Sequence, residues 1–155
     1  MQSVDFKIVS GGQTGVDRAA LDFALENNIP CGGRCPKGRP AEDGIIPSKY
    51  PLKETAGKDY SERTRKNIEE SDATLVIYKE NPDEGTKLTI TLCNKLSKPC
   101  FIVNLSSPSY SEKVFNLIAA NRIKTLNIAG PRESNSPGIY IEAFKFLSEI
   151  FQIDM

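Results

Sequence analysis

The sequence predicts a single α/β domain in three layers, with a mostly parallel sheet of about five strands between two layers of helices. Three observations lead to this prediction. The chain has 155 residues, which suits one domain, and 39% of them are hydrophobic. Short apolar segments alternate with longer segments whose apolar residues have helical spacing. Neither an internal repeat nor a linker interrupts this order, which is typical of a parallel sheet with helices on both faces.

The alternation defines ten elements. Asp59 and Glu62 have the spacing of a capping box before the second helix, and Ser136 and Pro137 are expected to cap the last one. The expected strands are residues 6–9, 29–31, 73–78, 99–103 and 124–129, and the expected helices are residues 16–25, 60–70, 86–96, 111–121 and 137–151. Right-handed crossovers place every loop that follows a strand at one edge of the sheet, where ligands of such folds bind.

Two segments depart from regular patterns. Residues 32–58 are rich in glycine and proline and are expected to form a long connection with little regular structure. Their apolar residues indicate that this segment packs against the domain; they are Ile45, Ile46, Tyr50 and Leu52. In the helix 86–96, three leucines stack at four-residue steps, while its threonines weaken the helical propensity.

Composition excludes several classes of function. The chain has 20 Lys and Arg against 20 Asp and Glu, so no overall charge favours nucleic acid or a membrane as partner. No apolar run approaches a membrane span and no signal peptide is apparent, so a cytoplasmic location is expected. The absence of histidine removes Ser-His-Asp and Cys-His mechanisms. The spacing of Cys31 and Cys35 is not that of a zinc site, so neither a metal site nor a disulfide framework is expected.

A glycine loop, Ser10-Gly-Gly-Gln-Thr-Gly15, joins the first strand to the first helix. Glycines let backbone N–H groups approach a ligand, and the start of a helix favours an anion. The loop is neither a Walker A motif nor a GxGxxG motif, and the simpler alternative is a turn that closes the strand–helix corner. The candidate ligand-binding residues here are Gly11, Gly12, Gln13, Thr14, Gly15, Asp17 and Arg18.

Further loops could complete a phosphate site at the same edge. Arg34, Lys37 and Arg39 lie in a glycine-rich segment and could clamp a phosphate or molybdate, or simply be solvated. Gly85 and Thr86 at a helix start, with Arg132 and Ser134 from the loop after the last strand, form a second candidate cradle, unless they only cap helices. A polar helix face could line the cleft, contact a second subunit or face solvent; it consists of Tyr60, Arg63, Thr64 and Asn67.

Five segments together resemble a known family: GGQTGVDRAALDFAL, CPKGRPAEDGIIPSKYPLKE, YSERTRKNIEESDATLVI, EGTKLT and NIAGPRESNSPGIY. They are similar to the "putative molybdenum carrier" family, which resembles the molybdenum-cofactor carrier proteins. That family lies in a wider Rossmann-like group with the lysine-decarboxylase-like nucleotide phosphoribohydrolases. The resemblance implies a Rossmann-like fold, a phosphate-bearing pterin or nucleotide as ligand, molybdenum cofactor or molybdate as cargo, and a homodimer or homotetramer. The binding role carries over to Gly11, Gly12, Thr14, Gly15, Gly85, Thr86 and Arg132.

One departure from the wider group concerns catalysis. The phosphoribohydrolases carry a Gly-Gly-x-Gly-Thr-x-x-Glu block, and Thr89 stands where its catalytic Glu would be. A threonine cannot move a proton as a carboxylate does or stabilise a positively charged transition state. We therefore expect a non-catalytic carrier of a phosphate-bearing molecule. The alternatives are a phosphoribohydrolase-like enzyme using Asp17, Glu42 or Asp43, a sensor of nucleotide derivatives, and an interaction subunit with a vestigial site.

Overall fold

A computed structural model describes residues 6–107 and 111–152 and contains a parallel sheet of five strands in the order β2-β1-β9-β7-β8. The strands are β1 (Lys7–Val9), β2 (Cys31–Gly32), β7 (Ala73–Tyr78), β8 (Cys100–Asn104) and β9 (Thr125–Ala129). Every neighbouring pair in this sheet is parallel. In β7 the residues from Ala73 to Ile77 are all buried, as expected for a central strand that is covered on both faces.

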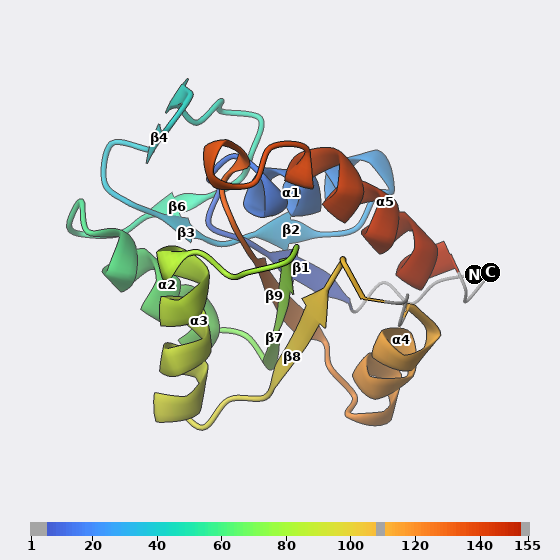
Figure 1. The fold of residues 1–155 in the computed structure, drawn as a ribbon. Helices are drawn as coiled ribbons and strands as arrows, with labels where there is room; N and C mark the ends of the chain where they lie inside the picture. Colours follow the sequence, from blue (N-terminus) through green and yellow to red (C-terminus); the bar gives the residue numbers. More distant parts are fainter. Residues whose placement is uncertain (1–5, 108–110, 153–155) are drawn as a thin grey trace.

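Helices cover both faces of this sheet, so the predicted three-layer α/β architecture is confirmed (Figure 1). The helices are α1 (Val16–Glu26), α2 (Tyr60–Glu69), α3 (Glu84–Lys95), α4 (Ser111–Ala120) and α5 (Ile139–Gln152). Helix α5 packs against α1 and α4 on one face, and α2 packs against α3 on the other. Phe23 on α1 meets Phe144 on α5 edge to face, with ring centroids 5.8 Å apart.

Residues 32–58 are more regular than expected, although the pieces are very short. β3 (Arg34–Cys35) pairs in parallel with β6 (Lys53–Glu54), and β4 (Pro40–Ala41) forms an antiparallel hairpin with β5 (Gly44–Ile45). The prediction that this segment packs against the domain is confirmed for Ile46, Tyr50 and Leu52, which form a small core with Leu21 and Cys35. It is wrong for Ile45, whose exposed fraction is 76% because it lies on the projecting hairpin.

The start of α5 differs from the prediction. A short helix η1 (Glu133–Asn135) precedes it, and Ser136 belongs to the end of η1 rather than to the cap of α5. The cap is the Glu133 carboxylate, which accepts the N–H groups of Gly138 (2.6 Å) and Tyr140 (3.0 Å). At α2, Asp59 caps the helix as predicted by accepting the N–H of Ser61. Glu62 instead accepts the N–H of Gly57, so the capping box is not reciprocal.

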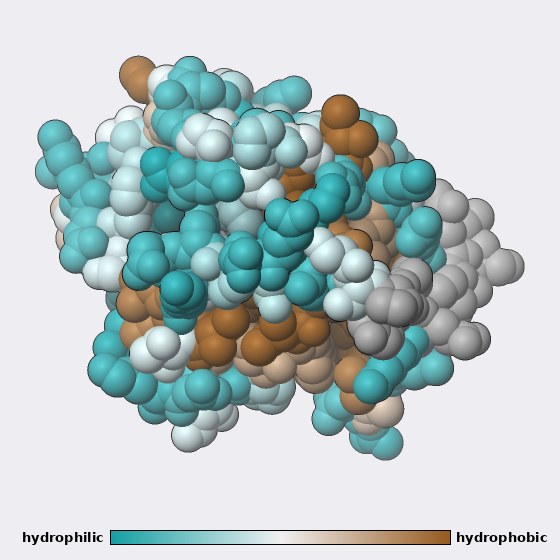
Figure 2. Space-filling view, viewed as in Figure 1, coloured by the Kyte–Doolittle hydropathy of each residue, from teal (hydrophilic) through white to brown (hydrophobic). Residues whose placement is uncertain are grey.

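Helix α3 begins two residues before its predicted start and turns an unexpected face inward. Its buried residues are Thr86, Thr89 and Cys93, whereas Leu88 of the leucine stripe is 37% exposed. Figure 2 shows apolar side chains gathered over α3 and β8, where Ile102 is also exposed, below a largely hydrophilic upper part. Across the described residues, no helix combines the length and apolarity that crossing a bilayer demands.

Candidate ligand-binding site

A cavity of about 520 Å³ opens beside the carboxyl ends of the central strands. Its walls come from the glycine loop, α2, the start of α3, the end of β9 and the loop that follows β9. The lining residues are Gly11, Gln13, Asp17, Arg63, Thr64, Asn67, Asp83, Glu84, Gly85, Thr89, Asn127, Ala129, Gly130, Arg132 and Asn135. The cavity therefore lies at the edge of the sheet that the strand–helix order indicated.

The glycine loop has the tight geometry that the sequence predicted. Gly12 and Gly15 have φ values of 84° and 79°, a region that other residues rarely adopt. A Cβ at Gly15 would lie 2.3 Å from the carbonyl oxygen of Pro131, so the loop and the segment after β9 touch at the backbone. The glycines thus let the two walls of the cavity meet.

The loop's N–H groups are largely engaged by the chain itself. The N–H of Gly12 faces the Ser10 hydroxyl at 3.4 Å, that of Gln13 faces the Asp17 carboxylate at 3.3 Å, and that of Thr14 donates to the Gln13 side-chain oxygen. From the sequence, these groups were expected to bind an oxyanion. In the structure the loop instead presents the side chains of Gln13 and Asp17 to the cavity.

Two guanidinium groups make the cavity wall locally basic. Arg63, with a side chain 11% exposed, donates from Nη1 to the carbonyl oxygen of Gly11 at 2.8 Å and lies 3.6 Å from the Asp17 carboxylate. Arg132 reaches the wall from the loop after β9. Both guanidinium carbons lie within 6 Å of the Tyr60 ring, at 5.3 Å and 5.9 Å, in cation–π contact.

Two buried donor atoms on residues that line the cavity have no hydrogen-bond partner within residues 6–107 and 111–152. They are Nε2 of Gln13 and Nε of Arg63. The Gln13 oxygen accepts the N–H groups of Thr14 and Glu42 at 3.0 Å and 2.9 Å, which fixes the orientation of its amide. An unsatisfied buried donor costs about 1–3 kcal/mol, so a rearrangement that brings an acceptor oxygen to either atom would be favourable.

Asp17 is the titratable group most affected by its surroundings in this wall. Burial raises its pKa from 3.8 to about 6, although Arg63 opposes the shift. A carboxyl group with such a pKa exchanges a proton near neutral pH. Asp17 can therefore act as an acceptor of hydrogen bonds or as a proton carrier toward a ligand in the cavity.

The start of α3 supplies the acidic side of the cavity. The Asp83 carboxylate accepts both the N–H (2.9 Å) and the hydroxyl (2.6 Å) of Thr86, and also the amide of Asn135. Burial pushes its pKa upward, but these hydrogen bonds outweigh burial and hold the pKa below its usual value. Thr86 is thus occupied as part of a helix cap. Thr89 lines the cavity and donates to the carbonyl oxygen of Gly85, so no carboxylate stands at that position.

The structure places the predicted site residues in two groups. Those that line the cavity are Gly11, Gln13, Asp17, Gly85 and Arg132. Those outside its lining are Gly12, Thr14, Gly15, Arg18, Lys37, Arg39, Thr86 and Ser134. Arg18 donates from Nε to the carbonyl oxygen of Gly12 and pairs through both terminal nitrogens with Asp43, at 3.0 Å and 3.1 Å.

The basic cluster of residues 34–39 does not form the predicted phosphate clamp. Arg34 pairs with Glu70 at 2.9 Å, and Lys37 is exposed. Arg39 stabilises the fold of its own segment, because its guanidinium donates hydrogen bonds of 2.8–3.2 Å to backbone carbonyl oxygens. These oxygens belong to Ile46, Pro47, Tyr50 and Leu52. The three cations are close in the sequence, but in the structure each side chain either pairs with a different local acceptor or faces solvent.

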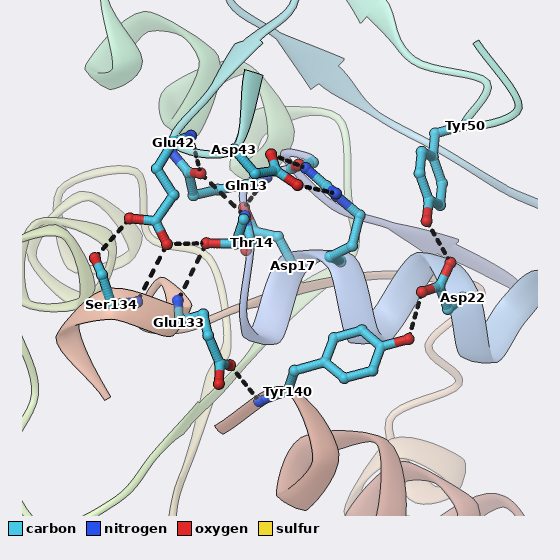
Figure 3. A network of polar contacts seen from close by, with 12 residues as sticks. Gln13, Thr14, Asp17, Asp22, Glu42, Asp43, Tyr50, Glu133, Ser134 and Tyr140 are labelled. Carbon is cyan, nitrogen blue, oxygen red and sulfur yellow. Dashed lines mark hydrogen bonds and ion pairs between the residues drawn. The ribbon is translucent and has the colours of Figure 1, made fainter. Parts of the chain in front are cut away.

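Thr14 and Ser134 meet outside the cavity around the carboxylate of Glu42 (Figure 3). The Ser134 hydroxyl and N–H donate to it at 2.6 Å and 3.1 Å, and the Thr14 hydroxyl donates to the same oxygen as that N–H. Thr14 in turn accepts the N–H of Glu133 at 3.1 Å. Hydrogen bonds from Ser134 and then Thr14 are the main causes that lower the pKa of Glu42.

Several residues that line the cavity were not among the predicted site residues, and others were named only as one of several possibilities. Arg63, Thr64 and Asn67 of the polar helix face line the cavity, whereas Tyr60 of the same face is 37% exposed. Asn127 is 3% exposed, and its amide donates to the Thr74 hydroxyl at 3.2 Å. The available signal was a polar residue inside an otherwise apolar strand. Asn135 carries no such signal, because its role depends on a distant contact.

Thiol and carboxylate ligands for a metal are not assembled at this site. None of the four cysteines lines the cavity. Over residues 6–107 and 111–152, no group of three Cys, Asp or Glu side chains is placed to hold a metal ion. Beside the carboxylates of Asp17, Asp83 and Glu84, the cavity presents guanidinium, amide and hydroxyl hydrogen-bond donors, which suit the oxygens of an oxyanion.

The parallel sheet with a polar cavity at its carboxyl edge defines a Rossmann-like α/β protein. Residues 8–151 match the model of the circularly permutated YpsA SLOG family, and the chain belongs to this family. It is also similar to the crystal structure of the "Putative molybdenum carrier protein" from Syntrophus aciditrophicus SB, with 42% sequence identity, 97% of each chain covered and a TM-score of 0.89. No curated protein matches the chain.

Proposed function

We propose that this protein carries a phosphate-bearing small molecule in the cavity, with the molybdenum cofactor as the first candidate. The observation that carries the proposal is the pair of guanidinium groups, of Arg63 and Arg132, in the cavity wall beside Gln13, whose Nε2 has no partner among the described residues. Phosphate oxygens would accept hydrogen bonds from these guanidinium groups and be attracted by their charge. The name of the similar protein from Syntrophus aciditrophicus supports molybdenum as the element carried.

The same donors suit molybdate, which also presents oxygen acceptors. Since no cysteine lines the cavity, a molybdenum compound would be held through its oxygen atoms and phosphate rather than through protein thiolates. The cytoplasmic location and the homodimer or homotetramer implied by the resemblance stay predictions alongside this proposal.

Titration calorimetry with molybdenum cofactor, molybdate and nucleoside monophosphates tests the proposal. We expect Arg132→Met to lower the affinity for the ligand by about tenfold to a hundredfold, as for the loss of a charge-assisted hydrogen bond. Arg65→Met is the matched control, because Arg65 lies on the exposed side of α2 and pairs with Glu69. The proposal fails if the folded wild type binds none of these ligands, or if both variants bind like the wild type.

A second candidate function is hydrolysis of a nucleotide to free base and sugar phosphate, and Asp17 favours it. Its pKa of about 6 suits proton transfer in the cavity, where Thr89 offers no carboxylate. Glu42 and Asp43 are less suited because Ser134 and Arg18 bind them outside the lining. Incubation with nucleoside monophosphates decides the matter: free base from the wild type and none from Asp17→Asn supports an enzyme, and no base from either supports a carrier or sensor.

The third alternative is an interaction subunit with a vestigial site. Variants of the site distinguish it from the carrier and the enzyme. If it is correct, the variants Gly12→Val and Arg132→Ala still bind partner proteins. Ligand binding then has no effect on that interaction. A ligand that binds the wild type and is lost in Arg132→Met contradicts it.

A further inference from the structure

The Glu42 carboxylate sits in a ring of donors that would equally suit a bound anion. Both of its oxygens accept hydrogen bonds from Ser134, and one also accepts the hydroxyl of Thr14. Arg132 adds a guanidinium at 4.0 Å. These donors come from two loops, one after β1 and one after β9, which are far apart in the sequence. Charged hydrogen bonds of this kind are the strong ones.

This ring of donors adjoins the ligand cavity. Arg132 lines the cavity and also faces Glu42. Gln13 lines the cavity too, and its oxygen accepts the N–H of Glu42, while its buried Nε2 has no partner in the described part of the chain. An anionic group in the cavity and the carboxylate of Glu42 would therefore share two neighbours.

The turn that carries Glu42 is attached by polar contacts. Glu42 and Asp43 form the turn of the β4–β5 hairpin, which Figure 1 shows projecting beyond β3 and β6. Asp43 is held by Arg18, but its side chain is 49% exposed. Of the apolar residues in the paired strands, Ala41 packs against the small core, whereas Ile45 is 76% exposed. A hairpin tip held in this way can be displaced without unpacking the domain.

We infer that Glu42 occupies an anion subsite and that a phosphate group of the ligand replaces its carboxylate there. The inference rests on the proposed function, which it deepens: the ligand class is one with a second anionic group, such as a pyrophosphate or a phosphate beside another oxyanion. The subsite consists of Thr14, Ser134 and Arg132, and the hairpin withdraws when it is filled. Glu42 thus sets the affinity by competing with the ligand.

The direct test measures binding of inorganic phosphate and pyrophosphate to Glu42→Ala and Glu42→Gln by calorimetry. Glu42→Ala should bind both about tenfold more tightly than the wild type, since the internal competitor is gone, and Glu42→Gln should gain less. Glu69→Gln removes a charge from the exposed side of α2 and is the matched control. Adding Ser134→Ala to Glu42→Ala should abolish the gain. Equal affinity in wild type and Glu42→Ala, or a gain that survives Ser134→Ala, overturns the inference.

Hydrogen exchange gives a second readout that needs no variant to fold. Saturating pyrophosphate should speed amide exchange in residues 40–46 of the wild type, because the Glu42 N–H leaves the Gln13 oxygen. Pyrophosphate that binds while this exchange stays unchanged contradicts the displacement.

The two proposals fail in distinguishable ways. If no phosphate-bearing ligand of the panel binds the wild type but Glu42→Ala gains affinity for pyrophosphate, the subsite stands and the carrier function falls. If a panel ligand binds the wild type while Glu42→Ala and the wild type bind pyrophosphate alike, the carrier function stands and the subsite falls.

Discussion

Asp17→Asn should make the protein more stable at neutral pH, although it removes a charged residue from an ion pair. The wild-type carboxyl is buried, with a side chain 10% exposed, and its pKa rises from 3.8 to about 6 mainly because of that burial. The folded state therefore binds the proton more tightly than the unfolded state. This contribution to stability is fully present below pH 3.8 and is lost as the pH rises to about 6.

The size of the effect follows from the shift. At about 1.4 kcal/mol per pKa unit, the ionised carboxyl costs roughly 3 kcal/mol at pH 7 relative to the protonated one. An asparagine keeps an oxygen for the N–H of Gln13 but offers no charge to Arg63. We therefore expect a net gain of about 1–3 kcal/mol at pH 7 and little gain at pH 4.

Urea unfolding of both proteins at several pH values between 4 and 8 measures this. The difference in unfolding free energy should grow between pH 4 and pH 6 and then stay level. A difference that is constant over this range, or a variant that loses stability relative to the wild type as the pH rises, would refute the reasoning from burial.

Four further substitutions, one of them a control, test other contacts. Asp72→Asn should cost about 1–2 kcal/mol at pH 7, because the Asp72 carboxylate accepts two N–H groups at the start of β9 (both 2.9 Å). The pKa of Asp72 lies below its usual value through these bonds, so the cost should shrink as the pH falls below about 4 in urea titrations, the opposite trend to Asp17. Gly130→Ala should lower the melting temperature sharply, since its Cβ would lie 2.1 Å from a carbonyl oxygen of β7, whereas Gly85→Ala, with its nearest neighbour at 3.9 Å, should leave it unchanged or raise it; equal melting temperatures would contradict the geometry. Tyr50→Phe should cost about 1–2 kcal/mol in urea unfolding by removing the hydroxyl that donates to Asp22 at 2.6 Å, and an unchanged midpoint would show that this bond contributes nothing.

The sheet was predictable because its strands carry strong local patterns. Residues 73–78 form β7 as predicted, since a run of β-branched and apolar residues between polar ones favours a buried strand. The start of α5 was not predictable in the same way. Its cap, Glu133, lies several residues upstream across a turn at Gly138, so no spacing rule identifies it.

For the site, the sequence indicated the position but not the partners. The turn at the glycine loop follows from glycines alone. The contact of Thr14 with Glu42 and the bonds of Arg39 to backbone oxygens depend on how residues 32–58 fold. The two-residue strands of that segment leave no periodic signal in the sequence. Thr86 was correctly placed at the start of a helix, yet its hydroxyl donates a hydrogen bond to Asp83. A Gly-Thr pair in the sequence does not reveal that local partner.

The place of β9 in the sheet has a consequence for how the protein is made. β9 is the last strand of the chain, yet it lies between β1 and β7 and pairs with both. A chain emerging from the ribosome can pair β1 with β2 and β7 with β8, and contacts of α2 such as that of Arg63 with Gly11 can link the two sides, but the sheet itself stays in two ribbons until residues 125–129 arrive. The cavity straddles this seam, and Asn127 and Ala129 of β9 form part of its wall. The complete wall of the cavity therefore forms only after residues 125–129 have joined the two ribbons.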